Sequence, residues 1–265
     1  MADMIEKAFN DAWIDFYPKM GKVGGAFCCN LPFIKQSRIL TNYDKKFGDI
    51  LTLAHELGHA YHGLQIEDHL PLNSEYTMPV AETASTFNET IIMNASIDEA
   101  DDNEKLVLIE NQLQDLTQTI CDIYTRYLFE TKVFEENKHG FLYPNQLEEL
   151  MLDAQKEVFQ DALDPNYLHP YMWINKSHYY SADLSFYNFP YAFGNLFARG
   201  LYECYQKEGK AFNDKYRALL KATTVSSVEN VAMMADIDVT KKEFWTNSLK
   251  GIEDLINRYI SLTSK

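Results

Sequence analysis

Apolar residues recur at helical spacing along most of this chain, and the pattern predicts a mainly helical protein. Strand-like alternation is confined to residues 25–31 and 37–43, which indicate a small hairpin or sheet with Pro32 in its connection. No internal repeat, low-complexity tract or linker interrupts the chain. The sequence therefore predicts one mainly α domain over residues 1–265, with a small β element near its N-terminal end.

The expected helices are delimited by ordinary start and stop signals. Pro79 and Pro144 stand where the first turn of a helix accepts proline. A Thr240-x-x-Glu243 capping box predicts the start of the last helix. The other predicted helices cover residues 5–16, 50–62, 79–95, 101–137, 144–161 and 191–207.

Residues 164–190 have little helical periodicity and many aromatic side chains, and they include His169 and His178. A long irregular segment in a compact domain is usually functional or disordered, and so much aromatic surface argues against disorder. We therefore predict an ordered loop that lines a site. The alternative is that these side chains only fill the core.

Composition excludes several classes of partner. Hydrophobic residues make up 46% of the chain, enough for a sizeable core, and the formal net charge is -15. Nucleic acid and anionic membranes repel such a protein, so neither is expected as a partner. The sequence has no apolar run of about 18 residues that would span a membrane, and residues 1–10 lack the apolar core of a signal peptide. The four cysteines form no C-x-x-C pair, which favours reduced thiols and a cytoplasmic location. The oligomeric state stays open.

The chemistry begins at His55-Glu56-Leu57-Gly58-His59. Residues four apart share a face of a helix, so both imidazoles can reach one zinc ion. Glu56 projects beside them, where it can act on a water bound to that ion. A surface helix with two incidental histidines is the alternative.

The flanks of this motif support a helix. Asp49 is a suitable N-cap, no proline follows it up to His62, and Gly63 is placed as the C-terminal stop. His62 lies on the same general face as the histidine pair. We assign it a structural or supporting role rather than ligation.

Catalytic zinc usually takes three protein ligands and leaves a fourth position for water. Glu82 is the expected third ligand, because it lies on a rigid helix among small side chains that let two helix backbones approach. Glu89, seven residues on, is placed to accept the free N–H of a ligand histidine, with an ordinary solvated glutamate as the alternative. The other downstream carboxylates considered are Glu67, Asp68 and Glu75.

These residues also carry a family resemblance. The chain resembles the thimet oligopeptidase/oligoendopeptidase F family of zinc metallopeptidases, most of all its bacterial oligoendopeptidase F branch, from about residue 8 to the end. The motifs that carry the resemblance are His55-Glu56-x-Gly58-His59-x-x-His62, Glu82-x-x-Ser85-x-x-x-Glu89, Trp13-Ile14-Asp15, residues 21–28, His178-Tyr179-Tyr180 and residues 186–194.

The resemblance implies a zincin-type helical catalytic domain with one Zn²⁺ per chain. It implies His55, His59 and Glu82 as ligands and Glu56 as the base. His178 and Tyr187 match the pair that contacts the substrate carbonyl in the transition state. Family members usually carry a long helical N-terminal part, so this chain corresponds to their C-terminal, catalytic half.

Three further residues are assigned to substrate binding. The mammalian-type branch would have a second tyrosine at position 190, which here is Pro190, so Tyr191 is the nearest substitute. Tyr180 lies in the same aromatic segment. The strand that begins at Gly25 is expected to bind peptide backbone as an added strand, with a purely structural edge as the alternative.

The predicted function is a zinc-dependent endopeptidase that hydrolyses internal peptide bonds of short unfolded oligopeptides, through a zinc-bound water activated by Glu56. The alternative is a zinc-binding, catalytically weak, peptide-binding half that needs a missing N-terminal lobe. A zinc hydrolase of non-peptide substrates is a third possibility.

Overall fold

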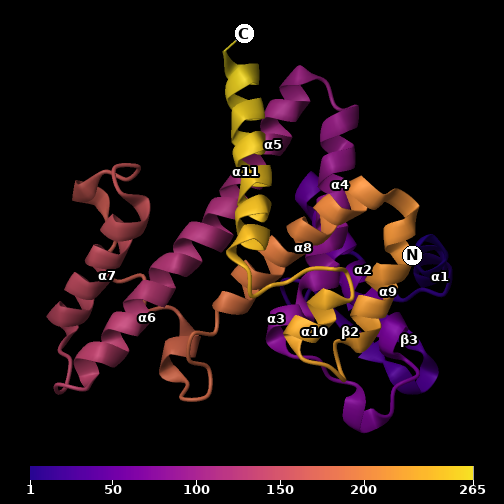
Figure 1. Cartoon of the computed structure of the whole chain (residues 1–265), viewed down its shortest axis with the longest axis horizontal. Coiled ribbons are helices and arrows are strands. Elements are labelled where there is room, and N and C mark those ends of the chain that lie inside the picture. The colour runs from indigo at the N-terminus through magenta and orange to yellow at the C-terminus, as the bar shows by residue number, and fades with distance from the viewer. Residues whose placement is uncertain (265) are drawn as a thin grey trace. The chain divides into compact units, whose positions relative to one another are not determined.

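A computed structural model describes residues 1–264 (Figure 1). The chain divides into two compact units, of which the first comprises Met1–Glu110 and Phe193–Lys265 and the second comprises Asn111–Ala192. Helices α5 (Asp102–Thr117) and α8 (Phe189–Glu208) run through the two boundaries. The mainly helical class with a small sheet near the N-terminal end is confirmed. A single domain stays a prediction.

The first unit contains a three-stranded sheet in the order β1-β3-β2. Strands β2 (Phe27–Leu31) and β3 (Gln36–Leu40) form the predicted antiparallel hairpin. Strand β1 (Ile14–Asp15) pairs parallel with β3, within a segment that helical periodicity had assigned to the first helix. Two residues are too few to show alternation, so only the pairing with β3 reveals this strand.

Helix α2 (Phe47–Ile66) is the centre of the first unit. It packs against the sheet, against α4 (Thr83–Glu99) and against α9 (Phe212–Ala222). Figure 1 shows it surrounded by these elements. The remaining helices of this unit are α1 (Ala2–Asn10), α3 (Met78–Ala81), α10 (Val228–Met233) and α11 (Lys242–Thr263).

The core of the first unit forms where apolar stripes of these helices meet. Leu57 and Tyr61 of α2, Phe87 of α4 and Phe197 of α8 are all buried in one cluster. The ring of Phe87 lies 4.5 Å from that of Tyr216 on α9. Burying one such side chain contributes about 1.5–3 kcal/mol, so this cluster holds the central helix in place.

The ends of α2 differ from the prediction. The helix begins at Phe47, and the Asp49 carboxylate accepts the backbone N–H groups of Asp44 and Lys46 from the third helical position rather than from the N-cap. Gly63 lies inside the helix. A Cβ there would stand 2.4 Å from the Asn30 side chain, so Gly63 permits close packing against β2 instead of ending the helix.

Other helix boundaries also differ, and the first helix ends at Asn10 instead of residue 16. The predicted helix over 79–95 is split by Glu82, whose backbone (φ -87°, ψ 3°) separates α3 from α4. The last helix begins at Lys242, and the Thr240 hydroxyl donates to Asp238 instead of forming the predicted capping box. The local hydrogen bond from Thr240 to Asp238 replaces the bond that would cap the helix.

The second unit is built on a helical hairpin of α6 (Ile123–Asn137) and α7 (Pro144–Phe159), as Figure 1 shows. Phe129, Met151 and Ala154 form its small core, with Trp173 and Tyr179 packed against it. A π-helical segment, Gln118–Asp122, joins α5 to α6 within the predicted long helix. Residues 164–188 have short helical turns and no strand or α-helix. No helix within residues 1–264 is long and apolar enough to cross a membrane.

Candidate metal centre

Helix α2 places His55 and His59 on one face, as their spacing predicts. The Nε2 atoms of the two rings lie 3.1 Å apart, and the rings meet edge to face with centroids 4.8 Å apart. Both side chains are partly buried. Two imidazole nitrogens therefore converge on one point beside the helix.

Glu82 brings a carboxylate to the same point from the junction of α3 and α4. Its Oε2 atom lies 3.2 Å from His55 Nε2 and 3.4 Å from His59 Nε2. Among the His, Cys, Asp and Glu side chains of residues 1–264, these three form the group whose ligand atoms lie close enough together to hold one metal ion. The structure thus brings together the predicted ligand set.

Two glycines allow Glu82 to reach this position. A Cβ on Gly58 of α2 would lie 2.5 Å from Ala84 O and Ser85 Cα, so only glycine lets α4 approach α2 this closely. A Cβ on Gly194 of α8 would lie 3.0 Å from the Cβ of Glu82. Backbone approach on two sides therefore determines where the carboxylate stands.

Neighbouring side chains orient two of the three groups. Glu89 Oε1 lies 2.5 Å from His55 Nδ1. Since a carboxylate accepts, the Nδ1 atom carries a proton, and Nε2 is the nitrogen that faces the cluster and is available to a metal once it loses its own proton. The Ser85 hydroxyl donates to Glu82 Oε2 at 2.9 Å. The motif Glu82-x-x-Ser85 includes this serine, but the sequence assigned it no role.

The electrostatics of the cluster favour a cation. Burial lowers the pKa of His55, but hydrogen bonds with Glu82 and Glu89 outweigh it and raise that pKa to about 10. Burial raises the pKa of Glu82, yet hydrogen bonds with His55 and His59 hold that pKa well below its usual range. The surroundings therefore stabilise positive charge at the point where the three ligand atoms meet.

Glu56 lies next to the cluster and is 5% exposed. Its Oε2 atom is buried and has no hydrogen-bond partner. Burial raises the pKa of this carboxyl, and the nearby histidines only partly offset that effect. It lines a cavity of about 450 Å³ together with His55, Glu89 and Gly25. A carboxylate with a raised pKa and a free oxygen suits proton transfer.

His62 points away from the cluster. Its Nε2 atom lies 2.8 Å from Thr223 Oγ1, and its ring stacks on Tyr76 with centroids 4.1 Å apart. The ring is fully buried, and burial lowers its pKa to about 3. His62 is thus a neutral packing residue that joins α2 to the end of α9.

Comparison with known proteins identifies the family of this chain. The model of Peptidase family M3 matches residues 1–251. The chain belongs to this family. The resemblance drawn from the motifs is therefore confirmed.

The relatives are bacterial peptidases. The chain is 26% identical over 267 residues to Oligopeptidase PepF of Bacillus subtilis, covering 100% of this chain and 39% of that protein. It is 26% identical to an oligoendopeptidase F homolog of Lactococcus lactis, covering 97% of this chain and 44% of the relative. The chain thus spans about two fifths of the length of these M3 relatives.

A solved structure shares the fold. A crystal structure of a candidate peptidase from Chlamydophila abortus superposes with a TM-score of 0.85 at 23% identity, covering 98% of this chain and 44% of that chain. At this identity the likeness speaks for the fold alone. The helical arrangement around α2 is therefore common to this chain and to a longer protein.

The other predicted site residues lie in the second unit. The ring of His178 lies 5.8 Å from that of Tyr187, and the Tyr187 hydroxyl lies 3.4 Å from that of Tyr191. His178 is buried, and burial together with the charge of Arg126 lowers its pKa. The Tyr180 hydroxyl donates to Ile174 O. The predicted donors of the M3 resemblance therefore lie together within this unit.

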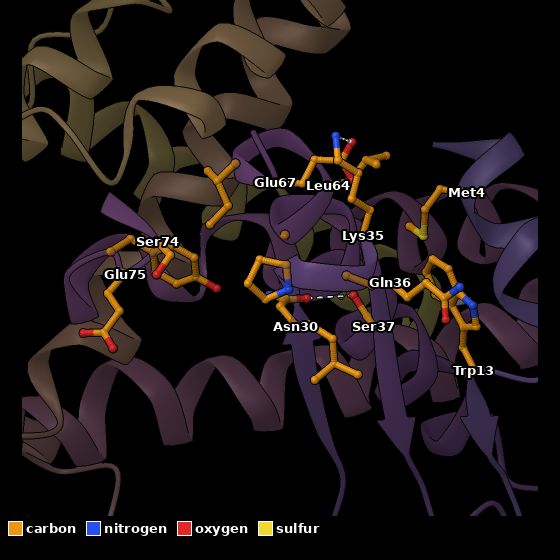
Figure 2. Close-up of a pocket in the computed structure, with 16 residues that line it drawn as sticks. Met4, Trp13, Asn30, Lys35, Gln36, Ser37, Leu64, Glu67, Ser74 and Glu75 are labelled. Carbon is orange, nitrogen blue, oxygen red and sulfur yellow. Dashed lines mark hydrogen bonds and ion pairs between the residues drawn. The ribbon is translucent and has the colours of Figure 1, made fainter. Parts of the chain in front are cut away.

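One cavity of the first unit was not indicated by any motif. It measures about 420 Å³ and lies along α2 beyond the histidine pair, at Ala60, Leu64 and Glu67. Figure 2 shows Asn30 bonded to Ser37 and Lys35 paired with Glu67 near the middle of the view, with Trp13 and Met4 at the right and Ser74 and Glu75 at the left. Its lining comes from segments distant in the sequence, so no local pattern could reveal it.

Proposed function

We propose that the chain is the zinc-dependent catalytic part of an endopeptidase that cleaves internal peptide bonds of short unfolded oligopeptides. Membership of Peptidase family M3 supports peptidase chemistry. The observation that carries the proposal is the convergence of His55, His59 and Glu82 beside the free Glu56 carboxylate.

The donor set fits zinc. Imidazole nitrogens and a carboxylate oxygen are ordinary zinc ligands, and tetrahedral bonds of about 2.0–2.2 Å place ligand atoms about 3.3–3.6 Å apart. The three ligand atoms here are separated by 3.1, 3.2 and 3.4 Å. One zinc ion per chain would be held by His55, His59 and Glu82. When bound, it supplies a Lewis acid that polarises the scissile carbonyl and acidifies water.

Glu56 would serve as the general base and acid. Its raised pKa makes it a stronger base than an ordinary glutamate, and the residue lines the cavity next to the ligand histidine His55. The proton taken from water would then pass to the leaving amine. Because the residue does not ligate the metal, its loss should stop turnover without releasing the ion.

Residues of the aromatic segment would bind the substrate and its developing charge. We carry over from the M3 resemblance the role of His178 and Tyr187 as donors to the carbonyl oxygen as it becomes negative. Removing one such donor typically lowers turnover by about 10²–10³. Tyr191, hydrogen-bonded to Tyr187, and Tyr180 would contact the peptide. Gly25 lines the cavity beside Glu56, and its strand would pair with the backbone of the bound peptide.

The test is turnover of a short internally quenched peptide by the purified chain, with bound metal quantified in the same samples. Wild type, Glu56→Gln and chelator-treated protein are compared, with Glu99→Gln as the control because Glu99 is exposed at the end of α4. We expect cleavage by wild type and the control only, and metal retained by Glu56→Gln. Cleavage by Glu56→Gln at the wild-type rate would refute its role.

One observation favours the alternative of a catalytically weak half. The chain spans only 39–44% of the length of its M3 relatives, so the activity of those longer proteins does not by itself establish that this part cleaves peptides. Stoichiometric metal binding without peptide cleavage would establish this alternative. Cleavage lost on chelation would exclude it.

A further inference from the structure

Two side chains of α6 reach the turn that carries Tyr187. Glu130 Oε1 accepts the backbone N–H of Phe186 at 2.8 Å, and Arg126 Nη1 donates to Asn188 Oδ1 at 3.1 Å. Arg126 and Glu130 are four residues apart, so they share one face of the helix. Their hydrogen bonds flank Tyr187 on both sides, within the second unit.

The turn needs such support because its own backbone is unfavourable. Phe186 has a φ of +56°, in the left-handed region that a bulky residue seldom adopts. Such a conformation persists only where its surroundings enforce it. The Phe186 ring packs on Phe134 and Tyr127, but a cavity of about 510 Å³ opens beside Glu130 and His178. Packing alone therefore does not surround this turn.

The Arg126 side chain is itself anchored, and Glu130 is buried. Asp122, which is 5% exposed, forms an ion pair with Arg126 and accepts from Gln118 at 2.5 Å. Gln118 and Asp122 bound the π-helical segment before α6, an irregularity that often accompanies functional sites. Glu130 is 8% exposed. A buried carboxylate is costly unless it is hydrogen-bonded, and the Phe186 N–H is the partner that the structure provides.

We propose that Glu130 and Arg126 are positioning residues, which hold the turn around Tyr187 so that its hydroxyl is preorganised as a donor. The role rests on the proposed function, in which Tyr187 assists the reaction. Misplacing a reacting group by about 1 Å can cost about 10²-fold in rate. Loss of the tether should therefore act on kcat through Tyr187 rather than on metal binding.

Amide hydrogen exchange tests the tether without requiring activity. In Glu130→Met, the amides of residues 184–189 should exchange about tenfold faster than in wild type, as the loss of a hydrogen bond to a charged group predicts. Glu130→Gln, which keeps an acceptor oxygen, should restore slow exchange. Glu136→Met is the control, because Glu136 is an exposed residue of the same helix. Unchanged exchange in Glu130→Met would overturn the proposal.

Asn188→Ala provides a second variant in case Glu130→Met fails to fold. It removes the bond to Arg126 from the partly exposed turn rather than from the helix, so α6 and its buried ion pair stay intact. Faster exchange of the same amides is expected. Exchange as slow as in wild type would show that the hydrogen bond between Arg126 and Asn188 does not restrain the turn.

A double-mutant cycle connects the tether to catalysis. Glu130→Met should lower kcat in the wild-type background and have no further effect in Tyr187→Phe, because it acts through Tyr187. An equal loss in both backgrounds would overturn the proposal. Failure of the proposed function has a different signature, namely Tyr187→Phe with wild-type turnover. In that case the exchange data still decide whether the tether exists, and its catalytic role is rejected.

Discussion

Single residues outside the ligand set govern how well the site holds a metal. Glu89 is the clearest case, since its carboxylate lies 2.5 Å from His55 Nδ1 and determines which nitrogen carries the proton. The ligand histidine depends on this partner for both its tautomer and its ring orientation.

We expect Glu89→Ala to weaken zinc affinity by about 10–100-fold, the usual effect of removing a partner of a ligand histidine. The measurement is competition with a chromophoric chelator at constant pH. Glu99→Ala, at an exposed site on the same helix, is the control. An unaltered zinc affinity in Glu89→Ala would show that His55 needs no orienting carboxylate.

His62 predicts a dependence of stability on pH. Its pKa is lowered to about 3 in the folded protein from a usual value of 6.5, so the unfolded chain binds a proton that the folded chain excludes. This contribution to the unfolding free energy is fully present above pH 6.5 and is lost as pH falls toward 3.

Urea unfolding of chelator-treated protein between pH 7.5 and pH 5 measures this effect without a contribution from metal release. The unfolding free energy of wild type should fall with decreasing pH. In His62→Gln, position 62 has no titratable group, so the unfolding free energy should decrease less over the same pH range. Parallel pH profiles of the two proteins would contradict a buried neutral His62.

At the scale of elements, the site depends on the contact between α2 and α4. Gly58 is the point of closest approach, where a side chain would overlap the backbone of Ala84 and Ser85. These two residues directly follow the turn that carries Glu82. Any separation of the helices therefore moves the third ligand away from the histidine pair.

We expect Gly58→Ala to lower the unfolding free energy by about 1–3 kcal/mol, the typical cost of overpacking, and to weaken metal binding at the same time. Gly48→Ala is the matched control, because Gly48 lies in the same helix with open space around its Cβ position. That control should be neutral or slightly stabilising. Denaturant unfolding and metal titration of both variants provide the measurement, and normal zinc binding by Gly58→Ala would refute the dependence.

At the scale of the whole molecule, all three proposed ligands belong to the first compact unit. A ligand stabilises the part of the protein that must be folded to bind it, by about 2.7 kcal/mol at 100 times its Kd. Metal should therefore protect the first unit, whereas the hairpin of α6 and α7 has no ligand to contribute.

Amide hydrogen exchange with and without zinc tests this expectation. Zinc should slow exchange in α2 and α4 strongly and leave α6 and α7 nearly unchanged. A magnesium-treated sample controls for ionic effects, because magnesium prefers oxygen ligands in octahedral geometry. Equal protection of both units would show that the chain unfolds as one cooperative block.

The sequence by itself determined what depends on short spacing. The period of the helix places His55 and His59 side by side whatever surrounds them, and Glu56 follows from the same motif. The hairpin, the helical class and the membership of the M3 family were also predicted, because alternation, periodicity and motif residues are local properties.

Only the tertiary structure decided what depends on contacts between distant segments. The sequence favoured Glu82 among several downstream carboxylates, but the packing of α4 on α2 is what brings its carboxylate beside the histidine pair. The tertiary structure also joined His62 to Thr223, 161 residues away, and placed Gly63 against Asn30 instead of at a helix end. Local patterns carry no information about which backbone will approach a given helix. The glycine contacts and buried partners that complete the site are therefore visible only after packing.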